Sequence, residues 1–232
     1  MPLEDTTEDH PDTEPPPSYH LHGINSIILV RQIPSQGISF QLWPPATTLI
    51  TLLDRHRTSH PSPLSSLFDS CAAPHRRLRL LELGSGTGAV GIAAAALLGA
   101  SVTITDLPHV LPNLQFNIAA NAKILELHGG AVDAAALQWG QTTDMEAIGR
   151  EYDVILGSDL VYHENLYEPL LKTLRFLLLG SEQKVVFLMS HLKRWKKESA
   201  FFKKANKFFD VEVFILIAHV MDPELESLST NL

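Results

Sequence analysis

The sequence has little cysteine and no long apolar segment. Cys71 is the one cysteine among 232 residues, so the chain cannot form an internal disulfide, which suits a reducing compartment. The longest uncharged apolar run, Ala89–Ala100, is too short to span a bilayer. The first residues are acidic and polar, whereas a signal peptide needs a basic start and an apolar run. We therefore expect a cytoplasmic protein, with the nucleus as the alternative, and no membrane partner.

Basic residues are missing from the start of the chain. Residues 1–20 contain six acidic side chains and no lysine or arginine, so they carry most of the net charge of −8. The remainder is nearly neutral, which argues against nucleic acid as a partner, because nucleic-acid-binding domains present a basic face. A local exception is residues 193–207, where seven lysines and arginines are opposed by Glu198 alone. We interpret this segment as a solvated helix face, with a docking surface for an acidic partner as the alternative.

Composition divides the chain into five parts. Residues 1–22 are acidic and proline-rich and are predicted to be a disordered tail. Residues 23–53 are predicted to form an N-terminal lid, with strands near 27–30 and 37–40 and a helix over 46–53. A mobile loop rich in Ser, Pro and His is expected over residues 54–77. The globular core is expected over residues 78–220, followed by an acidic C-terminal tail at 221–232.

Strands and helices alternate through the core. Strands are expected at residues 79–83, 101–106, about 130–132, 152–158, 184–190 and 211–218. Helices are expected at residues 89–98, 111–122, 166–178 and 194–208. This alternation predicts an α/β fold with a doubly wound, mostly parallel sheet. Ligands of such sheets bind at the carboxyl ends of the strands, beside the first strand.

The strongest local pattern is Arg79–Gly91, in which an apolar run is followed by three glycines and an alanine-rich helix. A strand, a glycine turn and a helix together bring bare backbone and a helix N-terminus against a nucleotide-like ligand. Gly84-x-Gly86-x-x-Ala89 also fits the looser dinucleotide fingerprint. This stretch alone therefore leaves open a nicotinamide enzyme and a tight turn without a ligand.

Asp106 narrows the ligand class. It ends the second core strand and lies 20 residues after Gly86, the position from which an acid accepts hydrogen bonds from ribose hydroxyls. An acid there can also cap a helix, but its spacing from the glycines favours an adenosine-bearing ligand.

Trp43 and Trp139 each have two interpretations. Trp43 either anchors the lid or contacts the ligand, and Trp139 either stacks on an adenine or closes the core.

These residues resemble the motifs of the seven-β-strand methyltransferases. The matching segments are Glu82-Leu-Gly84-Ser-Gly86-Thr-Gly88, Asp106, Trp139-Gly140 and Asp159-Leu-Val-Tyr162. The Leu-Trp43-Pro44 entry and the Asp-x-x-Tyr pattern are similar to methyltransferase family 16, over about residues 24–218. Members of that family methylate lysines on chaperones, AAA-type ATPases and translation elongation factors. The resemblance implies a Rossmann-like class I fold and S-adenosylmethionine as cofactor. It also implies a seventh strand, for which the residues after Val220 show no pattern, so this strand is expected to be missing or atypical.

The resemblance also implies roles for individual residues. The cofactor would be bound by Trp43, Glu82, Gly84, Gly86, Asp106, Leu107, Trp139 and Ser158. Asp159 and Tyr162 would be the catalytic pair, at the mouth where a target lysine meets the methyl group, and no metal is implied. Asp159 has an alternative as a helix cap, with Tyr162 packed beneath it. His163 and His191 are more readily read as solvated side chains than as catalytic ones.

The leading functional hypothesis is thus an S-adenosylmethionine-dependent protein-lysine methyltransferase that acts as a monomer. One alternative is a class I methyltransferase of RNA or of a small molecule. The pattern at Asp159–Tyr162 lacks the Asn/Asp-Pro-Pro-Tyr form, which argues against the amino groups of nucleobases. Another alternative is a catalytically weak binding or scaffold protein that keeps the fold.

Overall fold

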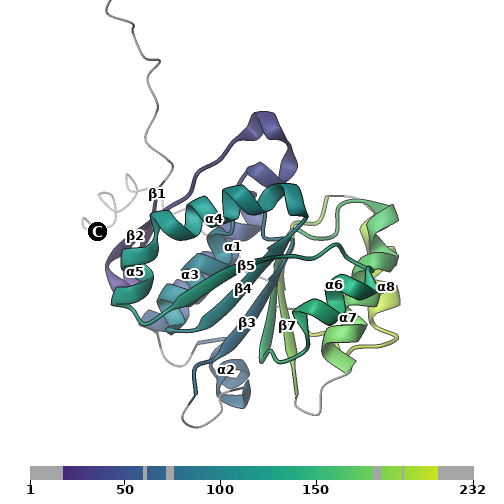
Figure 1. Ribbon diagram of the computed structural model, residues 1–232. Helices are drawn as coiled ribbons and strands as arrows, with labels where there is room; N and C mark the ends of the chain where they lie inside the picture. The colour runs from purple at the N-terminus through teal and green to yellow at the C-terminus, as the bar shows by residue number, and fades with distance from the viewer. Residues whose placement is uncertain (1–17, 60–61, 72–75, 180–183, 195, 214–232) are drawn as a thin grey trace, which may run out of the picture.

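The fold is built on a five-stranded sheet. The computed structural model describes residues 18–59, 62–71, 76–179, 184–194 and 196–213 (Figure 1). The strands are β3 (Arg79–Leu83), β4 (Ser101–Asp106), β5 (Ala131–Ala136), β6 (Val154–Ser158) and β7 (Val186–Ser190). Their order is β5-β4-β3-β6-β7, and every neighbouring pair is parallel. The predicted doubly wound α/β sheet is confirmed, with β3 at its centre and the change of winding direction between β3 and β6.

Helices cover both faces of this sheet. One face carries α1 (Pro44–Thr58), α3 (Ala89–Leu98), α4 (Leu111–Ala120) and α5 (Ala122–Leu127). The other face carries α6 (Thr142–Ile148), α7 (Tyr167–Leu179) and α8 (Ser199–Ala205), seen on the right of the sheet in Figure 1. Successive residues of β3 serve opposite faces, so Leu80 belongs to the first core and Leu81 to the second. Among the described residues, no helix has both the length and the apolar character to cross a membrane.

Helix α3 lies close against the sheet because its side chains are small. All its residues from Ala89 to Leu97 are buried. A Cβ added at Gly91 would lie 2.3 Å from Cγ2 of Ile104 on β4. A larger residue at this position would push the helix away from the sheet, and with it the glycine turn that begins the helix.

The N-terminal part of the chain is more ordered than predicted. Ser18–Leu21 form β1, which pairs antiparallel with β2 (Ser26–Leu29), so the expected disordered tail over residues 1–22 is wrong for its last residues. Leu21 is fully buried, and this long-range burial overrides the polar composition around it. Residues 1–17 lie outside the described residues.

Three buried asparagines of the α4–α5 region hold this N-terminal part. They are Asn113, Asn117 and Asn121. The Asn117 side chain accepts the Arg31 backbone N–H at 2.8 Å and donates to the Thr87 carbonyl at 2.8 Å. The Asn121 side chain accepts the Leu29 N–H at 2.9 Å and donates to the Leu29 carbonyl at 2.7 Å. Buried amides that satisfy strand backbone in this way attach the lid to the core.

Two further predictions in the N-terminal half are wrong. The strand expected near residues 37–40 is a 3-10 helix, Ile38–Phe40. The loop expected over residues 54–77 is partly helical, because α1 continues to Thr58 and α2 follows at Ser65–Cys71. The Asp54 carboxylate, which accepts the N–H groups of His22 and Gly23 at 3.0 and 2.7 Å, fixes the last turns of α1. Leu64 and Phe68 are buried in the first core, which accounts for α2.

The later elements differ mainly in their bounds. The helix expected at 111–122 divides into α4 and α5 at Asn121, and the third strand is longer than expected. The helix expected at 194–208 is shorter, with a 3-10 turn at Lys196–Glu198 before α8. Residues 211–213, at the start of the expected sixth strand, are not in a strand. The rest of that strand, the tail at 221–232 and the question of a seventh strand lie outside the described residues.

Candidate active site

The glycine turn between β3 and α3 has a backbone that only glycine adopts without strain. Gly84, Gly86 and Gly88 have left-handed φ angles of 56°, 58° and 77°. A Cβ at Gly84 would lie 2.9 Å from Cζ2 of Trp139, and one at Gly86 would lie 3.1 Å from the carbonyl oxygen of Ser39. The indole of Trp139 and the N-terminal lid therefore both approach the bare backbone of this turn. The turn has the features of a cradle for a ligand at the carboxyl edge of the sheet.

Asp106 lies beside this turn, as the spacing predicts. Its Oδ2 accepts the Gly86 N–H at 2.8 Å and its Oδ1 accepts the Leu107 N–H at 2.8 Å. Burial raises the pKa of Asp106, and these two hydrogen bonds oppose that rise. Each carboxylate oxygen has a second lone pair, so Asp106 retains two acceptor positions. Such a carboxylate fits a ligand with a vicinal diol, such as a ribose.

Glu82 supports the turn from inside the core. It is fully buried, and its Oε2 accepts the Gly91 N–H at 2.9 Å. Burial raises the pKa of Glu82 to about 8. The turn is also supported by Ser85 and Thr105, which sequence reasoning missed. The Thr105 hydroxyl donates to the Glu82 carbonyl at 2.7 Å, and the Ser85 hydroxyl accepts the Thr105 N–H at 3.0 Å. The available signals were a hydroxyl inside the apolar strand β4 for Thr105 and a hydroxyl between two glycines of the turn for Ser85.

The remaining predicted cofactor residues lie around the same edge. Trp43 precedes the first turn of α1, is 38% exposed and donates its indole N–H to the Ile38 carbonyl at 2.9 Å. This exposure favours ligand contact over a core anchor. Leu107, directly after Asp106, is 39% exposed. Trp139 is half-buried, so it both contacts Gly84 and packs against the second core. Ser158 ends β6 and is also half-buried.

Asp159 follows β6 in an unusual backbone conformation. Its φ is 58°, which is uncommon for a residue with a side chain and typical of functional sites. Its carboxylate accepts two hydrogen bonds from the Arg194 guanidinium, from Nη1 at 2.7 Å and from Nη2 at 2.6 Å. This ion pair raises the pKa of Arg194. The helix-cap alternative for Asp159 is wrong, because the carboxylate is in an ion pair and the next helical turn begins only at Glu164.

Tyr162 lies near both acidic groups of the site. It is 36% exposed, and burial of its hydroxyl raises the pKa of Tyr162, with further contributions from the charges of Asp106 and Asp159. The hydroxyl thus remains protonated at neutral pH. The neighbouring His163 is exposed, with its ring centroid 5.0 Å from that of Tyr162.

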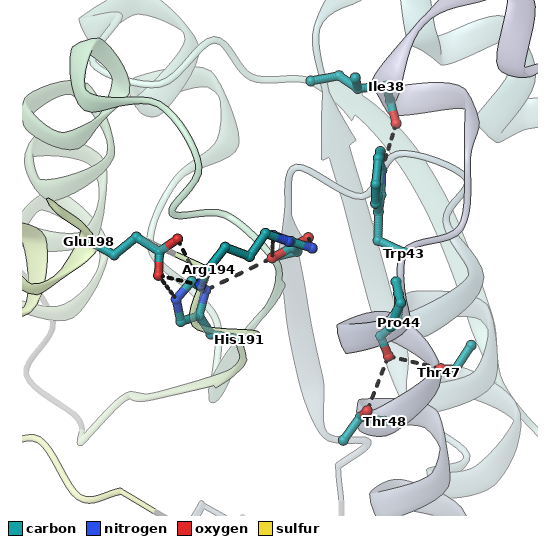
Figure 2. Close-up of polar contacts among 9 residues, drawn as sticks. Ile38, Trp43, Pro44, Thr47, Thr48, His191, Arg194 and Glu198 are labelled. Carbon is teal, nitrogen blue, oxygen red and sulfur yellow. Dashed lines mark hydrogen bonds and ion pairs between the residues drawn. The ribbon is translucent and has the colours of Figure 1, made fainter. Parts of the chain in front are cut away.

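His191 and Glu198 complete the polar group around Asp159. Figure 2 shows the His191 ring between Glu198 and the Arg194 side chain. The Nε2 atom of His191 is 3.0 Å from Oε2 of Glu198, and its Nδ1 is 3.9 Å from Oδ1 of Asp159. Glu198 is 2% exposed and also accepts the Arg194 backbone N–H. His191 is therefore not the solvated side chain that was expected.

The basic segment 193–207 is not simply a solvated face. Arg194 pairs with Asp159, Lys197 pairs with Glu164 at 3.0 Å, and Lys204 pairs with Glu168. Among the described residues, no group of three or more His, Cys, Asp or Glu side chains gathers in a way that could hold a metal ion.

A model of a family described as lysine methyltransferase matches residues 24–208. The chain belongs to this family. The resemblance drawn from the sequence motifs is thereby confirmed, and the nicotinamide reading of Gly84-x-Gly86-x-x-Ala89 is set aside. The glycine turn, Asp106 and Asp159–Tyr162 all lie within the matched residues.

Relatives of this chain carry names of the same kind. The EEF1A lysine methyltransferase 3 of Xenopus tropicalis is 36% identical over 140 residues, covering 60% of this chain and 58% of the relative. The protein N-lysine methyltransferase METTL21A of Danio rerio is 41% identical over 134 residues, covering 58% of each. The protein-lysine methyltransferase METTL21E of Mus musculus is 34% identical over 173 residues, covering 74% of this chain and 63% of the relative. The chain spans less than two thirds of the length of these curated relatives.

Proposed function

We propose that this protein transfers a methyl group from S-adenosylmethionine to a lysine side chain of a protein substrate, in the cytoplasm and as a monomer. The observation that carries the proposal is that Asp106 and Asp159 lie on opposite sides of the glycine turn that follows β3. Asp106 offers acceptors for a ribose on one side, and Asp159 with Tyr162 lies on the other side, in a chain that belongs to a lysine methyltransferase family.

The residues around the turn fit this cofactor. The left-handed glycines let the backbone turn sharply at the carboxyl end of β3, where the methionine and ribose parts would lie, and Asp106 has two acceptor positions for the ribose hydroxyls. Leu107 and Trp139 would pack near the adenine, Ser158 would line the pocket and Trp43 would close it from the lid. Glu82 would support the turn without reaching the ligand, because it is fully buried.

The protein's part in the reaction is mainly positioning. When bound, S-adenosylmethionine supplies a methyl group on a positively charged sulfur, and the lone pair of the lysine nitrogen displaces that sulfur as a neutral thioether. The target amine, with an ordinary pKa of about 10.4, must lose a proton before it has this lone pair. The Asp159 carboxylate would accept a hydrogen bond from the neutral amine, and the Tyr162 ring would confine it. Holding donor and acceptor in line accounts for the small number of catalytic groups.

The names of the relatives support a proposal for the substrate class. One of them is named for EEF1A and another as a protein N-lysine methyltransferase. We therefore place the substrate among translation factors, with chaperones and AAA-type ATPases as the further classes that the family resemblance implies.

The test uses Asp159→Ala and the more conservative Asp159→Asn. With radiolabelled cofactor and a purified translation factor, both variants should lose methyl transfer about a hundredfold or more, because the amine is no longer held in line. Calorimetric titration should show cofactor affinity retained, and Glu146→Ala, an exposed change on α6, should behave as the unchanged protein. Label found only on RNA or on metabolites would contradict the proposal. A chain that binds no cofactor would support the scaffold alternative.

A further inference from the structure

Arg194 is held in place by contacts at both its guanidinium and its backbone N–H. At the charged end, two parallel hydrogen bonds of 2.7 and 2.6 Å join the guanidinium to both carboxylate oxygens. Paired bonds of this kind impose a geometry as well as a charge. At the backbone end, the Arg194 N–H is held by Glu198 at 3.1–3.2 Å, and Glu198 is almost fully buried. The Asp159 side chain is itself only 8% exposed.

This ion pair joins the loop after β6 to the segment after β7 and faces Trp43 of the lid. The Arg194 Cζ atom is 5.9 Å from the centre of the Trp43 ring, which stands opposite in Figure 2. The titratable and charged groups that face the pair are His191 and Glu198, from the same segment as Arg194, and Tyr162 from the loop after β6. Asp106, at the end of β4, acts on Tyr162 through its charge. Arg194 is thus the cation paired directly with the acceptor carboxylate.

A carboxylate beside the target amine has two opposite effects. It orients the amine by accepting a hydrogen bond from it. It also favours the ammonium form, because an opposite charge within about 4–6 Å raises the pKa of an amine by one unit or more. An ammonium has no lone pair and cannot accept a methyl group. A site that uses an uncompensated Asp159 would therefore hold its substrate in the unreactive form.

We propose that Arg194 is a positioning residue for methyl transfer: by pairing with Asp159 it cancels the carboxylate charge, so that the target lysine enters as a neutral amine. The inference rests on the proposed function. The guanidinium uses one lone pair on each Asp159 oxygen and leaves the other free to accept from the amine. The fork also fixes the direction in which those free lone pairs point.

The alternative role for Arg194 is that of a plug, which occupies the place of the target ammonium until the substrate displaces it. The two roles predict opposite effects of removing the charge. If Arg194 is a plug, its substitution should raise the rate of methyl transfer at neutral pH. If Arg194 compensates the charge of Asp159, its substitution should lower that rate.

The experiment measures kcat and KM for methyl transfer against pH, at saturating cofactor, in Arg194→Gln and Arg194→Lys. In Arg194→Gln the rise of kcat with pH should move upward by about one unit, a loss of about tenfold near neutral pH that is recovered in alkali. Arg194→Lys keeps the positive charge but loses the paired hydrogen bonds of the guanidinium. Its kcat should therefore rise at the same pH as in the unaltered protein and reach a lower maximum. Lys197→Gln, which removes a charge from an exposed pair in the same segment, is the matched control.

A double variant separates charge from structure. In Arg194→Gln/Asp159→Asn both charges are gone, so the alkaline shift should disappear even though the plateau is low. In Arg194→Gln alone, the nearly buried Asp159 carboxylate loses its cation, which can destabilise the fold. The double variant has no such unpaired charge, so it remains informative if Arg194→Gln unfolds at a lower temperature. Calorimetry should show unchanged cofactor affinity in all variants.

The outcomes are distinguishable. An unshifted profile in Arg194→Gln, a shift that persists in the double variant, or a higher rate at neutral pH would each overturn the role of Arg194 while leaving the proposed function intact. Absence of protein methylation by the unaltered chain would instead remove the proposed function, and this inference with it.

Discussion

Replacing Glu82 by Gln should remove the pH dependence of stability that this one buried carboxyl imposes. Glu82 has no exposed surface, and burial raises its pKa from 4.5 to about 8. The negative charge of Asp106 contributes to the rise, while the hydrogen bond from the Gly91 N–H opposes it. Among the described residues, the Oε1 atom of Glu82 has no hydrogen-bond partner.

The sign and size follow from proton binding. Between the pKa of the unfolded chain and that of the folded chain, the folded protein holds one proton more than the unfolded protein. The contribution of Glu82 to the free energy of unfolding is therefore fully present below pH 4.5 and is lost as pH rises through about 8. Each pH unit between the two pKa values lowers the free energy of unfolding by about 1.4 kcal/mol, so the full change between pH 4.5 and about 8 is at most about 5 kcal/mol.

The Gln variant has no such titration but has a different defect. Its carbonyl oxygen still accepts the Gly91 N–H, while its amide N–H₂ group enters a site with no acceptor, at a cost of about 1–3 kcal/mol. The unaltered protein should thus be the more stable near pH 5, and the variant the more stable by about 2–4 kcal/mol near pH 8.

Urea unfolding across this range measures the difference directly, by linear extrapolation at each pH. Glu126→Gln, an exposed change on α5, is the control and should follow the unaltered protein at every pH. A difference between Glu82→Gln and the unaltered protein that stays constant from about pH 5 to pH 8 would refute the reasoning.

Two further substitutions test how the turn and the lid are held. Gly84→Ala places a Cβ at positive φ, 2.9 Å from the Trp139 ring, so calorimetry should show cofactor affinity reduced about tenfold or more and unfolding should show a loss of about 1–3 kcal/mol. Unchanged affinity would contradict the cradle assigned to this turn. Asn117→Ala leaves the Arg31 N–H and the Thr87 carbonyl without their partner, so denaturant unfolding should show a loss of about 2–3 kcal/mol, whereas Gln115→Ala on the exposed face of α4 should change stability little. Equal losses in both variants would show that the asparagine contacts contribute nothing specific.

The elements around the glycine turn could be predicted from the sequence because their signals are local. An apolar run, alternating glycines and an alanine-rich stretch predicted β3 and α3 with the bounds that the structure shows, and β4 likewise. The lid and the segment 54–77 could not be predicted in this way. There the outcome depends on distant partners, such as the Asp54 carboxylate that binds the backbone of Gly23.

The sequence by itself determined that Gly86, Asp106 and Asp159 would meet at one edge. Each lies at or just after the end of a buried strand, and the carboxyl ends of parallel strands share an edge. Only the tertiary structure decided that Asp159 would be paired with Arg194. Ser158 on β6 pairs in register with Ser190 on β7, so the residues that follow these strands come into contact although they lie far apart in the chain. No local pattern encodes that register, because it is set by the packing of whole strands against their helices.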